Sequence, residues 1–166
     1  TAFSPTIPDV RIYDHHGRSL RFCSDLIRDR TVAINFIFTS CTTTCPPLTA
    51  AMRAIQRELG ARVGRDIWLI SVSVDPAVDR PERLGTFATT FGAGPGWTFV
   101  TGSKTEIDRL LKAFGGSAGD IGAHSTTMLI GNARAGRWVR TNGLAPLATN
   151  VKLILDAAGR GPSGGS

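Results

Sequence analysis

A run of β-branched and aromatic residues at 31–38 leads directly into a polar segment with two cysteines four residues apart, Cys41 and Cys45. Within 32–38, Asn35 is the one residue that is not apolar. Such a run is typical of a strand buried on both faces, as in the centre of a parallel or mixed sheet. From 48 to 59, apolar residues then recur at the spacing of one helix face. The chain therefore predicts a buried strand, a cysteine loop and a helix in direct succession.

The remaining elements follow from strand alternation, turn residues and helix signals. We expect two short strands within 11–21 around the polar turn 14–17, because glycine suits the turn at its end. Further strands are predicted at 66–74, 97–100, 125–130 and 138–140, and further helices at 81–91, 103–114 and 146–158. This order predicts an α/β protein with a thioredoxin-like fold, a central mixed sheet flanked by helices and an N-terminal β-hairpin. We expect one domain over 1–160 and a flexible tail over 161–166.

Composition narrows the class of protein. Of the 166 residues, 42% are hydrophobic, which is enough for a sizeable core. The net charge is +6, but the basic residues are dispersed and only 7% of residues are aromatic, so we expect no nucleic-acid site. No apolar stretch reaches the ~18 residues of a membrane span. Because the chain starts at Thr1, we expect a mature or truncated form whose signal or membrane tether precedes it.

The two close cysteines can carry chemistry. If Cys45 starts the helix, the helix dipole favours its thiolate, the form that both metal binding and disulfide exchange require. Four residues across a first turn separate Cα atoms by roughly 6 Å, so the pair can close as a disulfide or hold one ion. Two thiolates suit Cu(I), whereas zinc would need four ligands. His124 is the best candidate for a third ligand, because it follows a Gly-rich segment and opens the strand at 125–130.

The other chemically active side chains have simpler interpretations. His15 and His16 lie in a predicted turn, and we expect both to be exposed. Cys23 is interpreted as a buried or half-buried free thiol. Asp75 and Asp79 precede prolines or an Arg-Pro pair and indicate a turn and a helix N-cap.

Four segments together resemble the Sco/SenC family. They are FIFTSCTTTCP at 36–46, SVDPAVDRPE at 73–82, WTFVTG at 97–102 and HSTTM at 124–128. The similarity runs in consistent order over about 10–155. A CxxxC pair alone would be a weak signal, but the four segments at these spacings are fairly specific.

The resemblance implies a thioredoxin-like fold and a copper site formed by Cys41, Cys45 and His124. It also implies a role in assembling the copper centre of cytochrome c oxidase. The implied partners are the copper-centre subunit or another copper chaperone, in a periplasmic or otherwise extracytoplasmic location with a membrane tether. Threonine fills 42–44 and Ala123 precedes the histidine, where the family commonly has proline and acidic residues. Missing carboxylates disfavour Cu(II), whereas they leave Cu(I) binding by two thiolates intact.

Two further functions remain open at this point. In a thiol–disulfide oxidoreductase, Cys41 or Cys45 would attack a target disulfide and the other cysteine would resolve the mixed disulfide, without any need for His124. Such an enzyme could act on the cysteines of a copper-site partner. A thiol peroxidase is the third alternative, although the spacing of the cysteines and the four family segments fit copper better.

Overall fold

The computed structural model describes residues 2–3, 6–40, 45–115 and 125–159. The strands within these residues are β1 (Ala2–Phe3), β2 (Arg11–Asp14), β3 (Ser19–Arg21), β4 (Thr31–Ile37), β5 (Ile67–Ser73), β6 (Trp97–Thr101), β7 (Thr127–Asn132) and β8 (Arg137–Asn142). The α-helices are α1 (Cys45–Leu59), α2 (Pro81–Thr90), α3 (Lys104–Gly115) and α4 (Leu147–Ala158). Two short helical segments accompany them, the π-helical η1 (Phe22–Ile27) and the 3-10 turn η2 (Gly60–Arg62).

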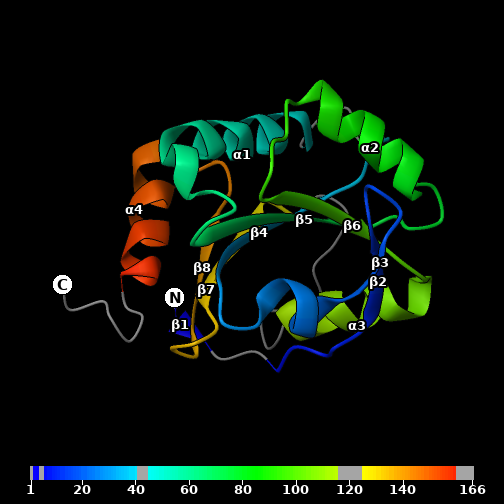
Figure 1. Cartoon of the computed structure of the whole chain (residues 1–166), viewed down its shortest axis with the longest axis horizontal. Helices are drawn as coiled ribbons and strands as arrows, with labels where there is room; N and C mark the ends of the chain where they lie inside the picture. The colour runs from blue at the N-terminus through cyan, green and yellow to red at the C-terminus, as the bar shows by residue number, and fades with distance from the viewer. Residues whose placement is uncertain (1, 4–5, 41–44, 116–124, 160–166) are drawn as a thin grey trace.

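The strands described here form one mixed sheet in the order β1-β8-β7-β4-β5-β6-β2-β3. β4, β5 and β6 are parallel, and the other pairs are antiparallel. In Figure 1, α1 and α2 lie on one side of the sheet, α3 and η1 lie on the other, and α4 stands beside α1. This is the predicted thioredoxin-like fold, with the expected hairpin formed by β2 and β3.

The central strand β4 is buried over its whole length, as its composition predicts. Val32, Ile34 and Phe36 pack into the core on the α3 side. Ala33 and Ile37 pack into the second core, beneath the other three α-helices. Because successive side chains of a strand point to opposite faces, a strand covered on both sides needs an almost continuous apolar sequence.

Asn35 is the polar residue within this strand, and a neighbouring strand partly satisfies it. Ser71 of β5 donates a hydrogen bond from its hydroxyl to Asn35 Oδ1 at 2.6 Å. Trp97 of β6 donates from its indole N–H to Ser71 Oγ at 3.1 Å. The three residues therefore form a polar chain across three strands inside the core, which lowers the cost of burying Asn35.

The predicted α-helices agree with the structure to within a few residues at their ends. Leu48, Met52, Ile55 and Leu59 form the buried face of α1. Ser103 Oγ accepts the Glu106 backbone N–H at 3.2 Å and so caps the amino end of α3.

The sequence patterns did not predict two elements, β1 and η1. β1, which pairs with β8, lies in the N-terminal stretch where no strand was expected. η1 follows the hairpin where no helix was expected. The expected tail at 161–166 lies outside the described residues.

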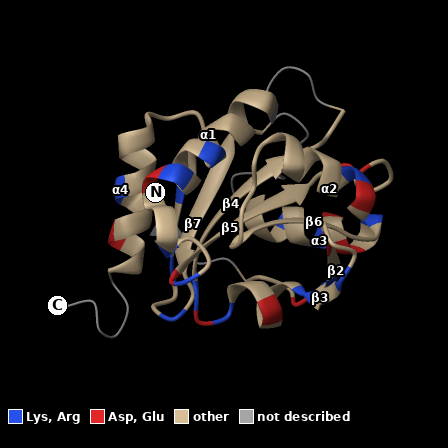
Figure 2. Ribbon diagram, turned by 45° about the horizontal axis from the view of Figure 1, so that its top comes forward, with Lys and Arg blue, Asp and Glu red and all other residues tan. Residues whose placement is uncertain are grey.

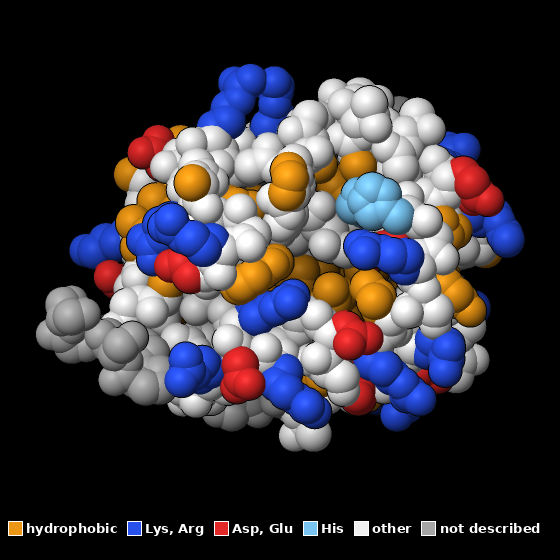
Figure 3. Space-filling model, viewed as in Figure 1, with side chains coloured by type: hydrophobic (Ala, Val, Ile, Leu, Met, Phe, Trp, Pro, Cys, Tyr) orange, Lys and Arg blue, Asp and Glu red, His pale blue; other side chains and the backbone are white. Residues whose placement is uncertain are grey.

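Charged side chains are dispersed over the molecule. In Figure 2, Lys and Arg lie on several helices and loops, interleaved with Asp and Glu. On the face shown in Figure 3, basic, acidic and apolar side chains alternate, and histidine reaches the surface. Among the described helices, none combines the length and hydropathy that crossing a bilayer requires.

Candidate functional site

The cysteine segment, residues 38–45, follows the carboxyl end of β4 at the centre of the sheet. Cys45 is the first residue of α1, so the expectation that it starts the helix is confirmed by the backbone. Cys41, the Cys45 side chain and His124 lie outside what the structure describes. The structure does describe the residues that flank them in the chain, and these can be placed in the fold.

Strand register brings the segment before β7 to the edge from which the cysteine segment leaves. β4 and β7 are antiparallel, with Ile34 opposite Leu129. β4 then ends at Ile37, and β7 begins at Thr127. The end of β4 and the beginning of β7 therefore lie at the same edge of the sheet.

A contact through Gly143 joins this edge to the amino end of α1. The Gly143 N–H donates to the Thr126 carbonyl oxygen at 2.6 Å. A Cβ atom added at Gly143 would lie only 2.8 Å from Leu48 Cδ2 and 3.2 Å from that carbonyl oxygen. Leu48 is three residues after Cys45, and Thr126 is two residues after His124. The backbone thus brings the chain beside Cys45 close to the chain beside His124.

Asp79 lies buried beside the start of the cysteine segment, which corrects its interpretation as a helix N-cap. Arg80 is the N-cap residue of α2. The fully buried Asp79 carboxylate instead accepts the Thr39 N–H at 3.0 Å and the Thr39 hydroxyl at 2.5 Å. It also accepts the Ser73 hydroxyl at 2.8 Å. The side chain therefore ties the end of β5 to the residue that stands two positions before Cys41.

The predicted turn at Asp75 is confirmed, and it does not use the Asp79 side chain. The Asp75 carbonyl oxygen accepts the backbone N–H groups of Val78 and Asp79, at 3.1 and 2.9 Å. The backbone hydrogen bonds close this turn. Sequence reasoning missed the contact with Thr39 because the two residues are 40 positions apart.

Arg83, in the first turn of α2, reaches the same place from the solvent side. Its Nε–H donates to Thr39 Oγ1 at 2.5 Å, and Nη2 lies 3.4 Å from Ser40 Oγ. Nε also lies 3.8 Å from Asp79 Oδ1. A basic side chain thus covers the last two residues before Cys41.

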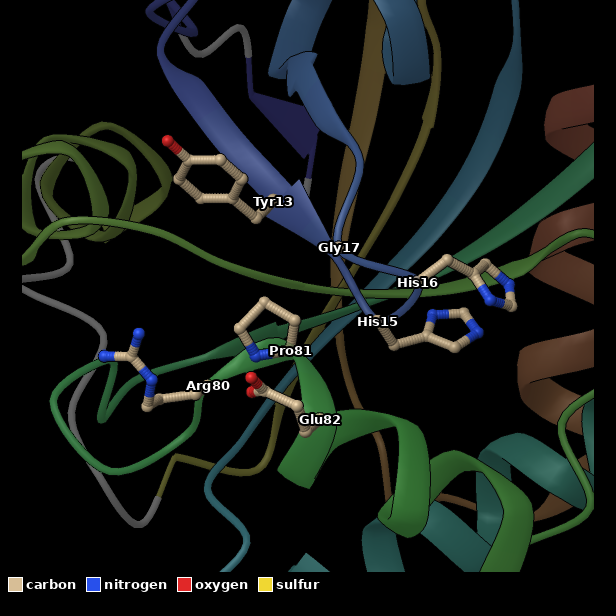
Figure 4. Close-up of a pocket in the computed structure, with 7 residues that line it drawn as sticks. All are labelled: Tyr13, His15, His16, Gly17, Arg80, Pro81 and Glu82. Atoms are coloured by element: carbon tan, nitrogen blue, oxygen red, sulfur yellow. The ribbon is translucent and has the colours of Figure 1, made fainter.

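The two adjacent histidines differ in exposure, which corrects half of the expectation for them. His16 is exposed, but His15 is half-buried and its Nδ1 accepts the Phe99 N–H at 3.1 Å. This bond places the proton of the neutral His15 ring on Nε2. Figure 4 shows the two rings side by side in a groove next to α2, with the Glu82 carboxylate pointing away from them. In the described part of the chain, no group of three or more His, Cys, Asp or Glu could hold a metal ion.

Acidification is expected to destabilise the protein through His15. Burial, followed by the charge of His16, lowers the pKa of His15 below 6.5. The unfolded chain therefore binds more protons than the folded protein just below pH 6.5. In that window the free energy of unfolding decreases as the pH is lowered. Urea unfolding between pH 7.5 and 5 should show this loss. His15→Asn should reduce it, because Asn Oδ1 can still accept the Phe99 N–H without titrating.

His16→Asn is the matched control, since it changes the exposed neighbour and should leave most of the pH dependence in place. Asp14 acts in a separate, more acidic window. Burial opposes its ionisation, but hydrogen bonds from Arg18 and His16 outweigh burial and hold the pKa of Asp14 below 3.8. If the pH dependence of unfolding were unchanged in His15→Asn, His15 would not be its source.

Cys23 is a half-buried free thiol, as expected. Its Sγ–H donates to the Ile7 carbonyl oxygen at 3.2 Å. Burial, with a further contribution from the Asp9 charge, raises the pKa of Cys23 to about 11. The thiol is therefore protonated at neutral pH and is a poor nucleophile and metal ligand.

Comparison with known proteins identifies the family. The family model described as SCO1/SenC matches residues 4–134, which is most of the chain. A curated relative, the SCO1 protein homolog of Bacillus subtilis strain 168, is 45% identical over 83 residues. That match covers 48% of this chain and 42% of the relative, so the chain matches less than half of the relative's length.

Solved structures share the fold over nearly the whole chain. A SCO1/SenC family lipoprotein from Bacillus anthracis str. Ames has a TM-score of 0.79 and 24% identity, covering 95% of this chain and 98% of that one. BsSco, described with a disulfide switch and as a member of the Sco family of cytochrome c oxidase assembly proteins, has a TM-score of 0.77 and 28% identity, covering 95% and 96%. Bradyrhizobium japonicum ScoI, solved with copper bound, has a TM-score of 0.73 and 20% identity, covering 92% and 99%. With its family match over most of its length and this shared thioredoxin-like fold, the chain belongs to the SCO1/SenC family.

Proposed function

We propose that this protein is a metallochaperone that holds Cu(I) through Cys41, Cys45 and His124 and helps assemble the copper centre of cytochrome c oxidase. The observation that carries the proposal is the contact of Leu48 with Gly143 and of Gly143 with Thr126. These contacts bring Leu48, three residues after Cys45, and Thr126, two residues after His124, to one edge of the sheet. Relatives described as copper-bound and as oxidase assembly proteins support the same conclusion.

The donor set fits the proposed cargo. Two thiolates and one imidazole form a soft set of three donors, which suits Cu(I) better than zinc or a hard cation. Cys45 stands at the amino end of α1, where the partial positive charge of the helix favours a thiolate. Both thiols must be reduced before copper can bind, because a disulfide removes the two sulfur donors.

The partners follow from the same role. We propose that copper passes to the copper-centre subunit of the oxidase or is exchanged with another copper chaperone. The protein would then work in the periplasm or another extracytoplasmic compartment, tethered to the membrane. The description of a B. anthracis relative as a lipoprotein supports a tethered form.

The first test is native mass spectrometry of the reduced protein after anaerobic Cu(I) addition and desalting. The wild-type protein should carry one copper ion. His124→Ala should bind it at least ~10-fold more weakly, a loss at the lower end of what removing groups around metal sites costs. His16→Ala, which removes an exposed imidazole elsewhere, should bind like the wild type. A wild-type protein without a copper adduct would overturn the chaperone proposal.

The second candidate is thiol–disulfide exchange, which the disulfide switch described for BsSco favours. One cysteine thiolate would attack a partner disulfide and release one partner thiolate. The other cysteine would attack the mixed disulfide, leaving a Cys41–Cys45 disulfide and a reduced partner. Two electrons pass to the partner, so another dithiol must reduce the pair again. This activity should survive His124→Ala, and Cys41→Ser should abolish it.

A further inference from the structure

We propose that Asp79, Thr39 and Arg83 form a clamp that positions the cysteine segment, with Asp79 as its buried centre. The inference rests on the proposed function of Cys41 and Cys45. It adds three positioning residues outside the proposed ligand set. The clamp would set how readily the two sulfur atoms come together, either in a disulfide or on one copper ion.

The Asp79 carboxylate makes hydrogen bonds to two different strand ends. Its Oδ2 accepts the Thr39 N–H and the Ser73 hydroxyl, and its Oδ1 accepts the Thr39 hydroxyl. All three of these hydrogen bonds therefore come from Thr39, just after β4, and from Ser73, the last residue of β5. A buried carboxylate is costly unless such donors surround it. The backbone closes the turn at Asp75 without this side chain, so the turn does not explain the burial of Asp79.

The hydroxyl of Thr39 links the buried carboxylate to the surface. It donates to Asp79 and at the same time accepts the Nε–H of Arg83. Valine at 39 would keep the shape of threonine but could make neither of these bonds. Serine would keep both.

Arg83 extends the clamp to Ser40, the residue directly before Cys41. Its side chain is half exposed, at 52%, so it covers Thr39 and Ser40 from the solvent side and takes little part in the core. Ser40 and Cys45, the described residues on either side of 41–44, are therefore held by the clamp and by α1. Fixing both ends of a short loop reduces the entropy lost when the two cysteines come together.

The test measures the dithiol–disulfide equilibrium of the full chain in dithiothreitol buffers at one pH, which requires no copper. Oxidised dithiothreitol takes two electrons from the cysteine pair, and the protein gains the disulfide. Alkylation labels the reduced thiols, and mass spectrometry then gives the fractions of the protein in the dithiol and disulfide forms. Thr39→Val, which removes both hydrogen bonds of the Thr39 hydroxyl, should lower the equilibrium constant for disulfide formation by about tenfold. Thr39→Ser should restore the wild-type value.

Arg83→Gln is the second variant, because a half-exposed side chain can be replaced without threatening the fold. It should shift the equilibrium in the same direction, whereas Arg80→Gln, one turn earlier on the exposed surface, should not. Thermal unfolding of the reduced proteins is measured in parallel. If Thr39→Val and Arg83→Gln changed only the unfolding temperature and left the equilibrium at its wild-type value, the clamp would be structural and the proposal wrong. A wild-type protein that failed to bind Cu(I) would refute the proposed function, and the disulfide equilibrium would still decide the role of the clamp.

Discussion

Cys41→Ser and Cys45→Ser are each expected to weaken Cu(I) binding by more than ~100-fold, because each removes one of the two proposed thiolate donors. Losing a group that only hydrogen-bonds a ligand typically costs ~10–100-fold in metal affinity, and losing a ligand should cost more. A serine hydroxyl is a hard and far less acidic donor, so it does not replace a thiolate on Cu(I). Anaerobic competition against a Cu(I) chelator measures the change.

Cys23→Ser is the matched control for these variants. It exchanges the same atoms, and serine can still donate to the Ile7 carbonyl oxygen as Cys23 does. Because the pKa of Cys23 is about 11, its thiol contributes little thiolate at neutral pH. Cys23→Ser should therefore bind copper like the wild type. Equal losses in all three variants would point to a general loss of folded protein and would contradict the assigned ligands.

Gly96→Ala is expected to lower the free energy of unfolding by about 2–5 kcal/mol, through backbone strain and overpacking together. Gly96 has φ of +92°, where an L-residue with a side chain is strained. A Cβ atom there would lie 2.4 Å from the backbone nitrogen of Gly64 and 2.6 Å from its Cα. These are main-chain atoms of the turn before β5, so no side chain can rotate away to make room.

Gly136→Ala separates the two contributions to this loss. Gly136 also has a positive φ, +66°, but an added Cβ would meet nothing within 4 Å. It should therefore show only the strain, about 1–2 kcal/mol. Urea unfolding of the two variants gives both values. Equal destabilisation would show that the close approach of Gly96 and Gly64 contributes nothing.

Local patterns predicted most of the helices and strands because each of them follows from residues close together in the chain. The apolar run at 31–38 has the composition of a strand covered on both faces, and β4 is such a strand. Leu48 and Met52 are spaced for one helix face, and both are buried in α1. β1 was missed because a strand of two residues is too short to show an alternating pattern. Its partner β8 also lies more than 130 residues away in the sequence.

The sequence alone determined the family resemblance, the central strand, the helix after it and the candidate ligands Cys41, Cys45 and His124. Each of these depends on residue identity or on spacing within a short window. Only the tertiary structure decided that Asp79 bonds Thr39, that His15 bonds Phe99, and that Gly143 brings Leu48 to Thr126. Asp79 and Thr39 are 40 residues apart, and His15 and Phe99 are 84 apart. Such bonds form only because the sheet brings distant strand ends together, and a polar residue has the same local pattern whether it faces water or a buried partner.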